Sequence, residues 1–214
     1  MYNTAYSPSA VVIDTSAMFK LSYGLFVLTA RDGDKDNGCI INTATQLTQD
    51  PLQISITVNK SNLTHDMILK TGLFSLSVLS TSTPFSIFQQ FGFQSGKNAD
   101  KFKDAPYDTR SADGVRYLPT FANSVISARV SDTYDCGTHT LFIASVIEAA
   151  VLSQEPSVTY QYYFDNIKPK PEVKESKELG YVCKICGYIY EGEPLPPDFI
   201  CPICKHGAVD FEKL

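Results

Sequence analysis

Apolar and polar positions alternate in short runs along most of the first 150 residues of the chain, and turn residues separate the runs. Runs of this length and spacing are typical of β-strands. They predict strands at residues 23–29, 39–41, 53–58, 74–79, 125–130 and 139–150. The turn-rich residues 32–38 between the first two runs indicate a hairpin. Six strands within about 130 residues suggest a β-barrel, so this part of the chain is expected to be mainly β.

Two short helices are expected to interrupt the strands. One begins at residues 62–64, and the other is capped by Ser82 or Thr83, with Pro84 in its first turn. Residues 92–120 are rich in Gly, Asp, Lys and Pro. We expect this stretch to form a long excursion outside the core.

The alternating pattern ends near residue 168. Residues 168–178 have one apolar side chain other than proline, and their alternating charges leave nothing to bury. The sequence therefore predicts a barrel domain over residues 1–167, a flexible charged linker over residues 168–177 and a small domain over residues 178–214.

Composition and charge narrow the function classes. The chain has 214 residues, 43% of them hydrophobic, which suits one ordinary domain with a small appendage. A net charge of -5 and a pI near 5.2 leave no basic stripe, so nucleic acid is not an expected partner. Apolar runs are shorter than the roughly 20 residues that cross a bilayer, and no signal peptide pattern is present. We expect a cytoplasmic protein that does not contact a membrane.

The six cysteines point to metal binding rather than to disulfides. Two Cys-x-x-Cys pairs near the C-terminus would bring four thiolates into a tetrahedral cage that suits iron or zinc. The four proposed ligands are Cys183, Cys186, Cys201 and Cys204. Residues 178–214 are too few to be stable through hydrophobic burial alone, so a metal would supply the missing core. A structural zinc ribbon fits the spacing as well as an iron site does. Cys39 and Cys136 stand alone and are expected to be small buried residues.

Five aromatic side chains in the small domain are expected to pack around the metal. They are Tyr181, Tyr188, Tyr190, Phe199 and Phe211.

The large domain lacks the two commonest nucleotide-binding motifs, GxGxxG and the Walker-type loop. Three other segments offer suitable groups. Residues 42–46 are small and polar after an apolar strand, residues 59–64 lead from a strand into a helix N-terminus that can hold a phosphate, and residues 95–101 add two lysines. Taken singly, each segment is more simply an ordinary loop.

Five segments in a fixed order resemble the flavin reductase-like family. They are residues 19–29 (FKLSYGLFVLT), 37–38 with 42–43, 59–60 with 63–65, 91–92 with 95–97 and 100–102, and 135–143 (DCGTHTLFI). The resemblance covers roughly residues 12–165 and implies an FMN-binding split β-barrel that works as a homodimer, with FMN at the subunit interface.

The resemblance also implies roles for particular residues. Contacts to the flavin ring and ribityl chain fall to Asn42, Thr43, Ala44 and Gln46, and contacts to the phosphate fall to Asn59, Lys60, Ser61, Asn62 and Thr64. Ser95, Gly96 and Lys97 would close over the cofactor. His139 would lie near the ring, although a hydrogen-bonded histidine at the start of a strand is an equally good interpretation.

The C-terminal segments 186–190 (CGYIY), 201–204 (CPIC) and 210–212 (DFE) look like rubredoxin, a family that holds one iron by four cysteines and carries single electrons. Only 14 residues separate Cys186 from Cys201, and the chain has no tryptophan. Both features are closer to the short rubredoxin domains of rubrerythrins than to stand-alone rubredoxins. The resemblance favours iron over zinc.

Together the two halves predict an electron relay. A nicotinamide gives two electrons at once and an iron accepts one, whereas a flavin can be reduced by two and give them up singly. We expect an NAD(P)H-dependent flavin and rubredoxin oxidoreductase that takes hydride onto FMN and passes single electrons through the iron to a protein acceptor. High-molecular-weight rubredoxins are similar to this chain, which implies a flavodiiron oxygen or nitric oxide reductase as acceptor. The alternatives are an electron carrier reduced by another protein, or an FMN-binding domain with a structural zinc ribbon.

Overall fold

The computed structural model describes residues 15–103, 109–169, 180–184, 188–201 and 207–214. Cys186, Cys204 and most of the expected linker lie outside the described residues. Among the described residues, no helix is both long enough and apolar enough to span a membrane.

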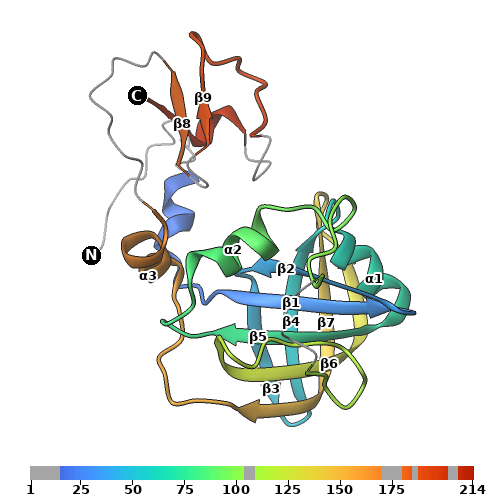
Figure 1. Cartoon of the computed structure of the whole chain (residues 1–214). Helices are drawn as coiled ribbons and strands as arrows, with labels where there is room; N and C mark the ends of the chain where they lie inside the picture. Colours follow the sequence, from blue (N-terminus) through green and yellow to red (C-terminus); the bar gives the residue numbers. More distant parts are fainter. Residues whose placement is uncertain (1–14, 104–108, 170–179, 185–187, 202–206) are drawn as a thin grey trace, which may run out of the picture.

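A single antiparallel sheet of seven strands builds the large domain, in the order β2-β1-β5-β6-β7-β4-β3. Its strands are β1 (Phe26–Asp32), β2 (Lys35–Ile41), β3 (Ala44–Gln49), β4 (Leu52–Asn59), β5 (Leu73–Leu79), β6 (Ala122–Asp135) and β7 (His139–Val151). The sheet curves around its own core, as Figure 1 shows, which gives the predicted barrel-like fold.

Short helical segments precede, connect or follow the strands. They are η1 (Thr15–Lys20), α1 (Leu63–Thr71), α2 (Phe85–Gly92), α3 (Tyr160–Tyr162) and the π-helical turn η2 (Tyr163–Ile167). α1 begins after Asn62 and ends at Gly72, whose φ of 70° is the left-handed conformation that glycine adopts at low cost.

Alternating side chains divide each strand between core and surface. In β4 the buried positions are Ile54, Ile56 and Val58, every second residue, and they pack against Phe142 of β7 inside the barrel. A second apolar cluster lies between β1, α2 and η2, where Phe88 and Tyr163 meet. This second cluster supports the elements around the cavity described below.

Several expectations for the large domain are confirmed. β1 and β2 form the predicted hairpin, with Thr29 paired to Gly38. The helix expected at residues 62–64 is α1. The second helix starts one step later than expected, because Pro84 is its N-cap rather than a residue of its first turn.

Other expectations were wrong. The described residues of the range 92–120 are not all outside the core. Phe102, Val115 and Leu118 are buried, and the Leu118 amide donates to the Ser77 hydroxyl of β5 at 3.0 Å. β3 was not predicted because its side chains are mostly exposed and polar, and no apolar alternation marks it. The helical turns of residues 160–167 also went unpredicted.

The described part of the small domain contains a three-stranded sheet in the order β10-β8-β9. Its elements are β8 (Tyr181–Cys183), β9 (Ile189–Tyr190), η3 (Ala208–Asp210) and β10 (Phe211–Lys213). Cys183, Cys201 and Phe211 form its core. The predicted aromatic shell is confirmed, because Tyr181, Tyr188, Tyr190 and Phe199 pack against that core.

Candidate functional site

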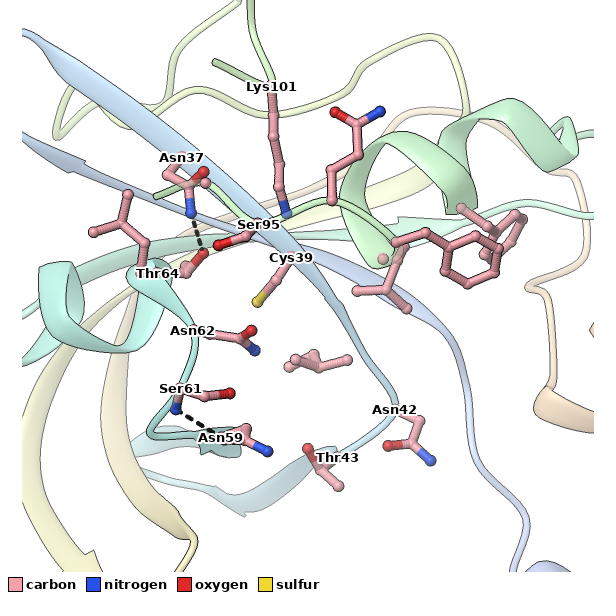
Figure 2. Close-up of a pocket in the computed structure, with 18 of the residues that line it drawn as sticks. Asn37, Cys39, Asn42, Thr43, Asn59, Ser61, Asn62, Thr64, Ser95 and Lys101 are labelled. Atoms are coloured by element: carbon pink, nitrogen blue, oxygen red, sulfur yellow. Dashed lines mark hydrogen bonds between the residues drawn. The ribbon is translucent and has the colours of Figure 1, made fainter. Parts of the chain in front are cut away.

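A cavity of about 650 Å³ opens at the rim of the barrel. It lies between the end of β2, the junction of β4 with α1, the end of α2 and the loop that follows α2. Figure 2 shows polar side chains from these elements converging on it. Its volume lies within the range of roughly 300–1,000 Å³ that is typical of sites for small molecules and cofactors.

The structure brings most of the predicted flavin-binding residues together in this cavity. The predicted residues that line it are Asn42, Thr43, Asn59, Ser61, Asn62, Thr64, Ser95, Gly96 and His139. They come from four segments far apart in the sequence, and the folding of the sheet places them around one space.

Four predicted residues lie outside this lining. Ala44 and Gln46 belong to β3, and the exposed Gln46 side chain donates a hydrogen bond to the carbonyl of Thr48 at 3.3 Å. The ammonium of Lys60 donates to the carboxylate of Asp135 at 2.7 Å.

Lys97 also lies outside the cavity. Its ammonium is 3.9 Å from the carboxylate of Asp66, and it lines a second, more open cavity on the other side of the loop. Neither lysine therefore points at the main cavity in this structure. A contact of Lys60 or Lys97 with the cofactor stays a prediction, and either side chain would have to leave its aspartate partner to make it.

The N-terminus of α1 forms one end of the cavity. Asn62 is the N-cap, and within the described residues its side chain makes no capping hydrogen bond. The Ser61 amide donates to the Asn59 side-chain oxygen at 2.8 Å, which shapes the turn that enters the helix. Unpaired backbone N–H groups and the helix dipole at such a terminus favour a negatively charged group. Asp66 in the first turn acts in the opposite sense.

A tightly packed loop forms the wall next to α1. The buried Asn37 side chain donates to the Thr64 hydroxyl at 2.8 Å. A Cβ added at Gly96 would lie 2.1 Å from the Asn37 side-chain oxygen, so only glycine fits where the loop crosses β2. This close approach holds the loop against the helix end.

Lys101 anchors the far end of the same loop. It is only 4% exposed, and its ammonium donates to the carbonyls of Gly38 and Phe91 at 2.8 and 2.9 Å. Burial lowers the pKa of Lys101. The loop is therefore tied to both β2 and α2, and its shape is fixed before a ligand binds.

Two titratable groups at the cavity differ in their surroundings. Partial burial, followed by the nearby His65, lowers the pKa of His139, which favours the neutral imidazole. Burial raises the pKa of the Cys39 thiol more than its hydrogen bond to Thr64 lowers it. Both groups are thus neutral at neutral pH.

His65 lies directly behind the cavity and was not predicted as part of it. It is buried, with one ring nitrogen 2.9 Å from the Thr140 hydroxyl and the other 3.0 Å from the Asp66 carboxylate. It fixes the relative positions of α1 and the start of β7, which carries His139.

Aromatic side chains form the other end of the cavity. They are Phe88, Phe93, Tyr160 and Tyr163. The two tyrosines could not be predicted as lining residues, because residues 160–167 show no regular apolar spacing. The cavity is therefore polar at the α1 end and aromatic at the α2 and α3 end.

These features fit a flavin cofactor. A flavin has a phosphate, a polyol chain and a flat aromatic ring, and the cavity offers a helix N-terminus, hydroxyl and amide side chains, and an aromatic end in that order. The donors include Ser61, Asn62 and Thr64 near the helix and Asn42 and Thr43 at the end of β2.

The candidate metal centre is described for two of its four predicted ligands. Cys183 and Cys201 are 1% and 0% exposed, inside the aromatic cluster of the small domain. Cys186 and Cys204 lie outside the described residues, and the part that is described holds no group of three or more metal-binding side chains. Two buried thiols in a domain this small fit a sulfur-ligated metal.

The two cysteines outside the Cys-x-x-Cys pairs differ in their exposure to solvent. Cys39 is buried as expected. Cys136 is exposed at the tip of the turn between β6 and β7, so the expectation that it is buried was wrong.

Comparison with known proteins identifies the large domain. Residues 18–170 match the family described as "Flavin reductase like domain". The chain belongs to this family. Residues 181–212 of this flavin reductase-like chain match a second family, "Rubrerythrin, rubredoxin-like domain". The predicted fusion of a flavin reductase-like domain with a short rubredoxin domain is thus confirmed.

Two relatives more than 30% identical support the assignment. The flavin reductase-like chain is 37% identical to the high molecular weight rubredoxin of Moorella thermoacetica, over 94% of this chain and 100% of that protein. It is 38% identical to the ferric-chelate reductase (NAD(P)H) of Archaeoglobus fulgidus, over 71% of this chain and 89% of that protein. The prediction of an oxidoreductase of the flavin reductase type is confirmed.

Solved structures confirm the predicted mainly β fold. The NADH:FAD oxidoreductase SgcE6 of Streptomyces globisporus, in complex with NAD and FAD fragments, superposes with a TM-score of 0.61. The two sequences are 20% identical, and the match covers 70% of the flavin reductase-like chain and 92% of SgcE6. An FMN-binding protein from Thermus thermophilus matches with a TM-score of 0.58 and 21% identity, over 70% and 80% of the two chains.

Proposed function

We propose that the chain is an NAD(P)H-dependent oxidoreductase that binds FMN in the large domain and passes single electrons through a four-cysteine iron to a protein acceptor. The observation that carries this proposal is the cavity, which is polar at a helix N-terminus and aromatic at its other end. The same chain also holds two buried cysteines that are proposed metal ligands. A bound flavin accepts a hydride and releases electrons one at a time, which is the chemistry that joins a nicotinamide to an iron.

The chain's own residues would bind and orient the flavin. The backbone N–H groups at the start of α1, with the hydroxyls of Ser61 and Thr64, suit the phosphate. Asn42 and Thr43, at the end of β2, suit the ribityl chain and the polar edge of the ring. The Thr43 hydroxyl already donates to the Thr57 carbonyl at 2.6 Å, which fixes its orientation.

FMN is proposed rather than FAD because the N-terminus of α1 suits a terminal phosphate. A phosphate seated there would complete the ligand. Proteins of similar fold include one that binds FMN and one that uses FAD. Extraction of the cofactor followed by mass spectrometry separates them.

His139 would assist the nicotinamide. It lines the cavity, and its lowered pKa keeps the ring neutral at neutral pH. A neutral imidazole can donate or accept a hydrogen bond at an amide such as the nicotinamide carboxamide. The names of two relatives include NADH or NAD(P)H as donor.

The small domain would hold the iron between Cys183, Cys186, Cys201 and Cys204. Burial of Cys183 and Cys201 among aromatic rings limits the access of water, which is one of the protein's means of setting an iron reduction potential. The predicted domain boundaries are also part of this proposal: a large domain over residues 1–167, a linker over residues 168–177 and a small domain over residues 178–214.

Three further parts of the proposal concern partners and location. Residues 178–214 carry six acidic and three basic side chains, which would favour an acceptor with a basic surface, such as a flavodiiron oxygen or nitric oxide reductase. A homodimer would complete the FMN site, and the cytoplasm would supply NAD(P)H.

The test is anaerobic addition of NADH and, separately, NADPH to purified protein whose metal content has been measured. The proposal requires iron and a flavin that at least one nicotinamide bleaches. A flavin that neither bleaches would support a carrier reduced by another protein. Zinc alone, in protein made with ample iron and without oxygen, would support a structural ribbon.

A further inference from the structure

An aromatic cluster continues outward from the wall of the cavity. Phe88 and Tyr163 both line the cavity, and their ring centroids are 4.6 Å apart. Behind them lies Phe164, with its ring 5.4 Å from that of Tyr163 and 4.9 Å from that of Tyr160. Because these residues belong to α2, α3 and η2, helical backbone fixes the order of the rings.

One lysine connects this cluster to the small domain. The Lys168 ammonium lies 4.8 Å from the centre of the Phe164 ring, within range of a cation–π contact. The same ammonium donates a hydrogen bond to the carbonyl of Lys184 at 2.7 Å. In Figure 1 the small domain lies beyond the end of the large domain that carries α3.

The carbonyl that Lys168 meets is held in place next to a predicted iron ligand. Lys184 directly follows the buried Cys183. The Cys183 amide donates to the Tyr188 carbonyl and the Lys184 amide to the Asp210 carbonyl, both at 2.8 Å. These two bonds fix the peptide groups on either side of Cys183, so the contact with Lys168 lies one residue from a held cysteine.

We propose that Lys168 docks the small domain against the Phe164 side of the flavin cavity in the same subunit, so that electrons pass from flavin to iron within one chain. This inference rests on the proposed function. In that function one NAD(P)H would give up two electrons and become NAD(P)⁺ and a released proton, and the two electrons would reach the single iron of the chain one at a time, each reducing it from ferric to ferrous. A one-electron protein acceptor then reoxidises the ferrous iron each time.

The docking contact is weak enough to open. It consists of one hydrogen bond from a partly exposed lysine and one ring contact, and such contacts contribute little individually. The chain between Lys168 and the small domain keeps the two at a high effective concentration, so a weak contact is enough for frequent docking. Release of the same contact would free the small domain to meet its acceptor.

The first test uses Lys168→Met, which keeps the aliphatic stem over Phe164 and removes the donor. Lys70→Met is the control, because it removes the same charge from a lysine on α1 that pairs with Asp32. Small-angle X-ray scattering of the oxidised holoprotein should show a larger radius of gyration for Lys168→Met and no change for Lys70→Met. An unchanged radius for Lys168→Met would overturn the docking.

The second test measures rates by anaerobic stopped-flow absorption. Lys168→Met should slow iron reduction by about fivefold to tenfold, the effect of losing roughly 1–1.4 kcal/mol of docking contact, and leave flavin reduction unchanged. If iron reduction keeps its wild-type rate, the inference fails while the proposed function stands. If wild-type flavin or iron is not reduced at all, the proposed function itself fails.

The third test separates transfer within a chain from transfer between chains. A metal-free Cys201→Ser protein is mixed and co-refolded with a variant that has lost its flavin. Transfer within one chain predicts that the mixture does not regain the fast phase of iron reduction. Recovery of that phase would show transfer between subunits and overturn the inference.

Discussion

Gly96→Ala tests whether the loop after α2 is a fixed wall of the flavin cavity. The added methyl group would lie 2.1 Å from the side-chain oxygen of Asn37 and 2.5 Å from its Cγ. Asn37 cannot move aside at low cost, because it is buried and donates to Thr64 at 2.8 Å. The loop must therefore shift away from the helix N-terminus, or the Asn37–Thr64 bond must break.

Either response has a cost that can be estimated. Overpacking a well-packed site costs typically about 1–3 kcal/mol, and loss of a buried hydrogen bond falls in a similar range. If this free-energy cost applies to the flavin-bound state and not to the free protein, the affinity for flavin should fall by about 5- to 150-fold. The free energy of unfolding of the flavin-free protein should fall by no more than the same amount.

The assay is a fluorescence titration of flavin-free protein with FMN, alongside urea unfolding. Gly92→Ala is a matched control on the same wall, because its added methyl group would lie 3.4 Å from Ile40, an ordinary contact. The control should bind FMN within about twofold of wild type. Wild-type affinity and stability in Gly96→Ala would show that the loop does not pack against Asn37 as described.

Three other variants test the metal site, the titration of His139 and the anchoring of the loop after α2. Cys201→Ser should abolish the iron spectrum and transfer to the acceptor while NADH still bleaches the flavin, and loss of FMN would contradict independent domains. Burial lowers the pKa of His139 in the folded protein, so unfolding gains a proton and stability falls as the pH drops below about 6.5. His139→Gln should flatten that fall in thermal unfolding at pH 5–7, and an unchanged slope would refute the assignment. Lys101→Met should lower the free energy of urea unfolding by about 1–3 kcal/mol, whereas wild-type stability would show that its bonds to Gly38 and Phe91 are not needed.

Strong local patterns made much of the fold predictable. The β1–β2 hairpin combines apolar runs with a turn-rich segment, and its register follows from both. The edge strand β3 has no buried alternation and gave no such signal. The location of residues 92–120 was predicted wrongly, because most of them are polar and the few core side chains among them, such as Leu118, follow no regular spacing. Their burial depends on tertiary contacts with the sheet.

The candidate site was predictable only where a segment carries several binding groups together. Asn59, Ser61 and Asn62 stand next to a helix start, so their shared position at the cavity was foreseeable. The sequence does not reveal that Lys60 turns to Asp135, because that partner is distant in the chain. Tyr163 likewise reaches the cavity only through tertiary packing.

The most direct test of the relay is multiwavelength stopped-flow absorption after anaerobic mixing of the holoprotein with NADH or NADPH. The account predicts that the flavin band bleaches first and that the ferric sulfur-to-iron band bleaches after it. Flavin bleaching with an iron band that persists would contradict it, as would iron reduction that precedes flavin reduction.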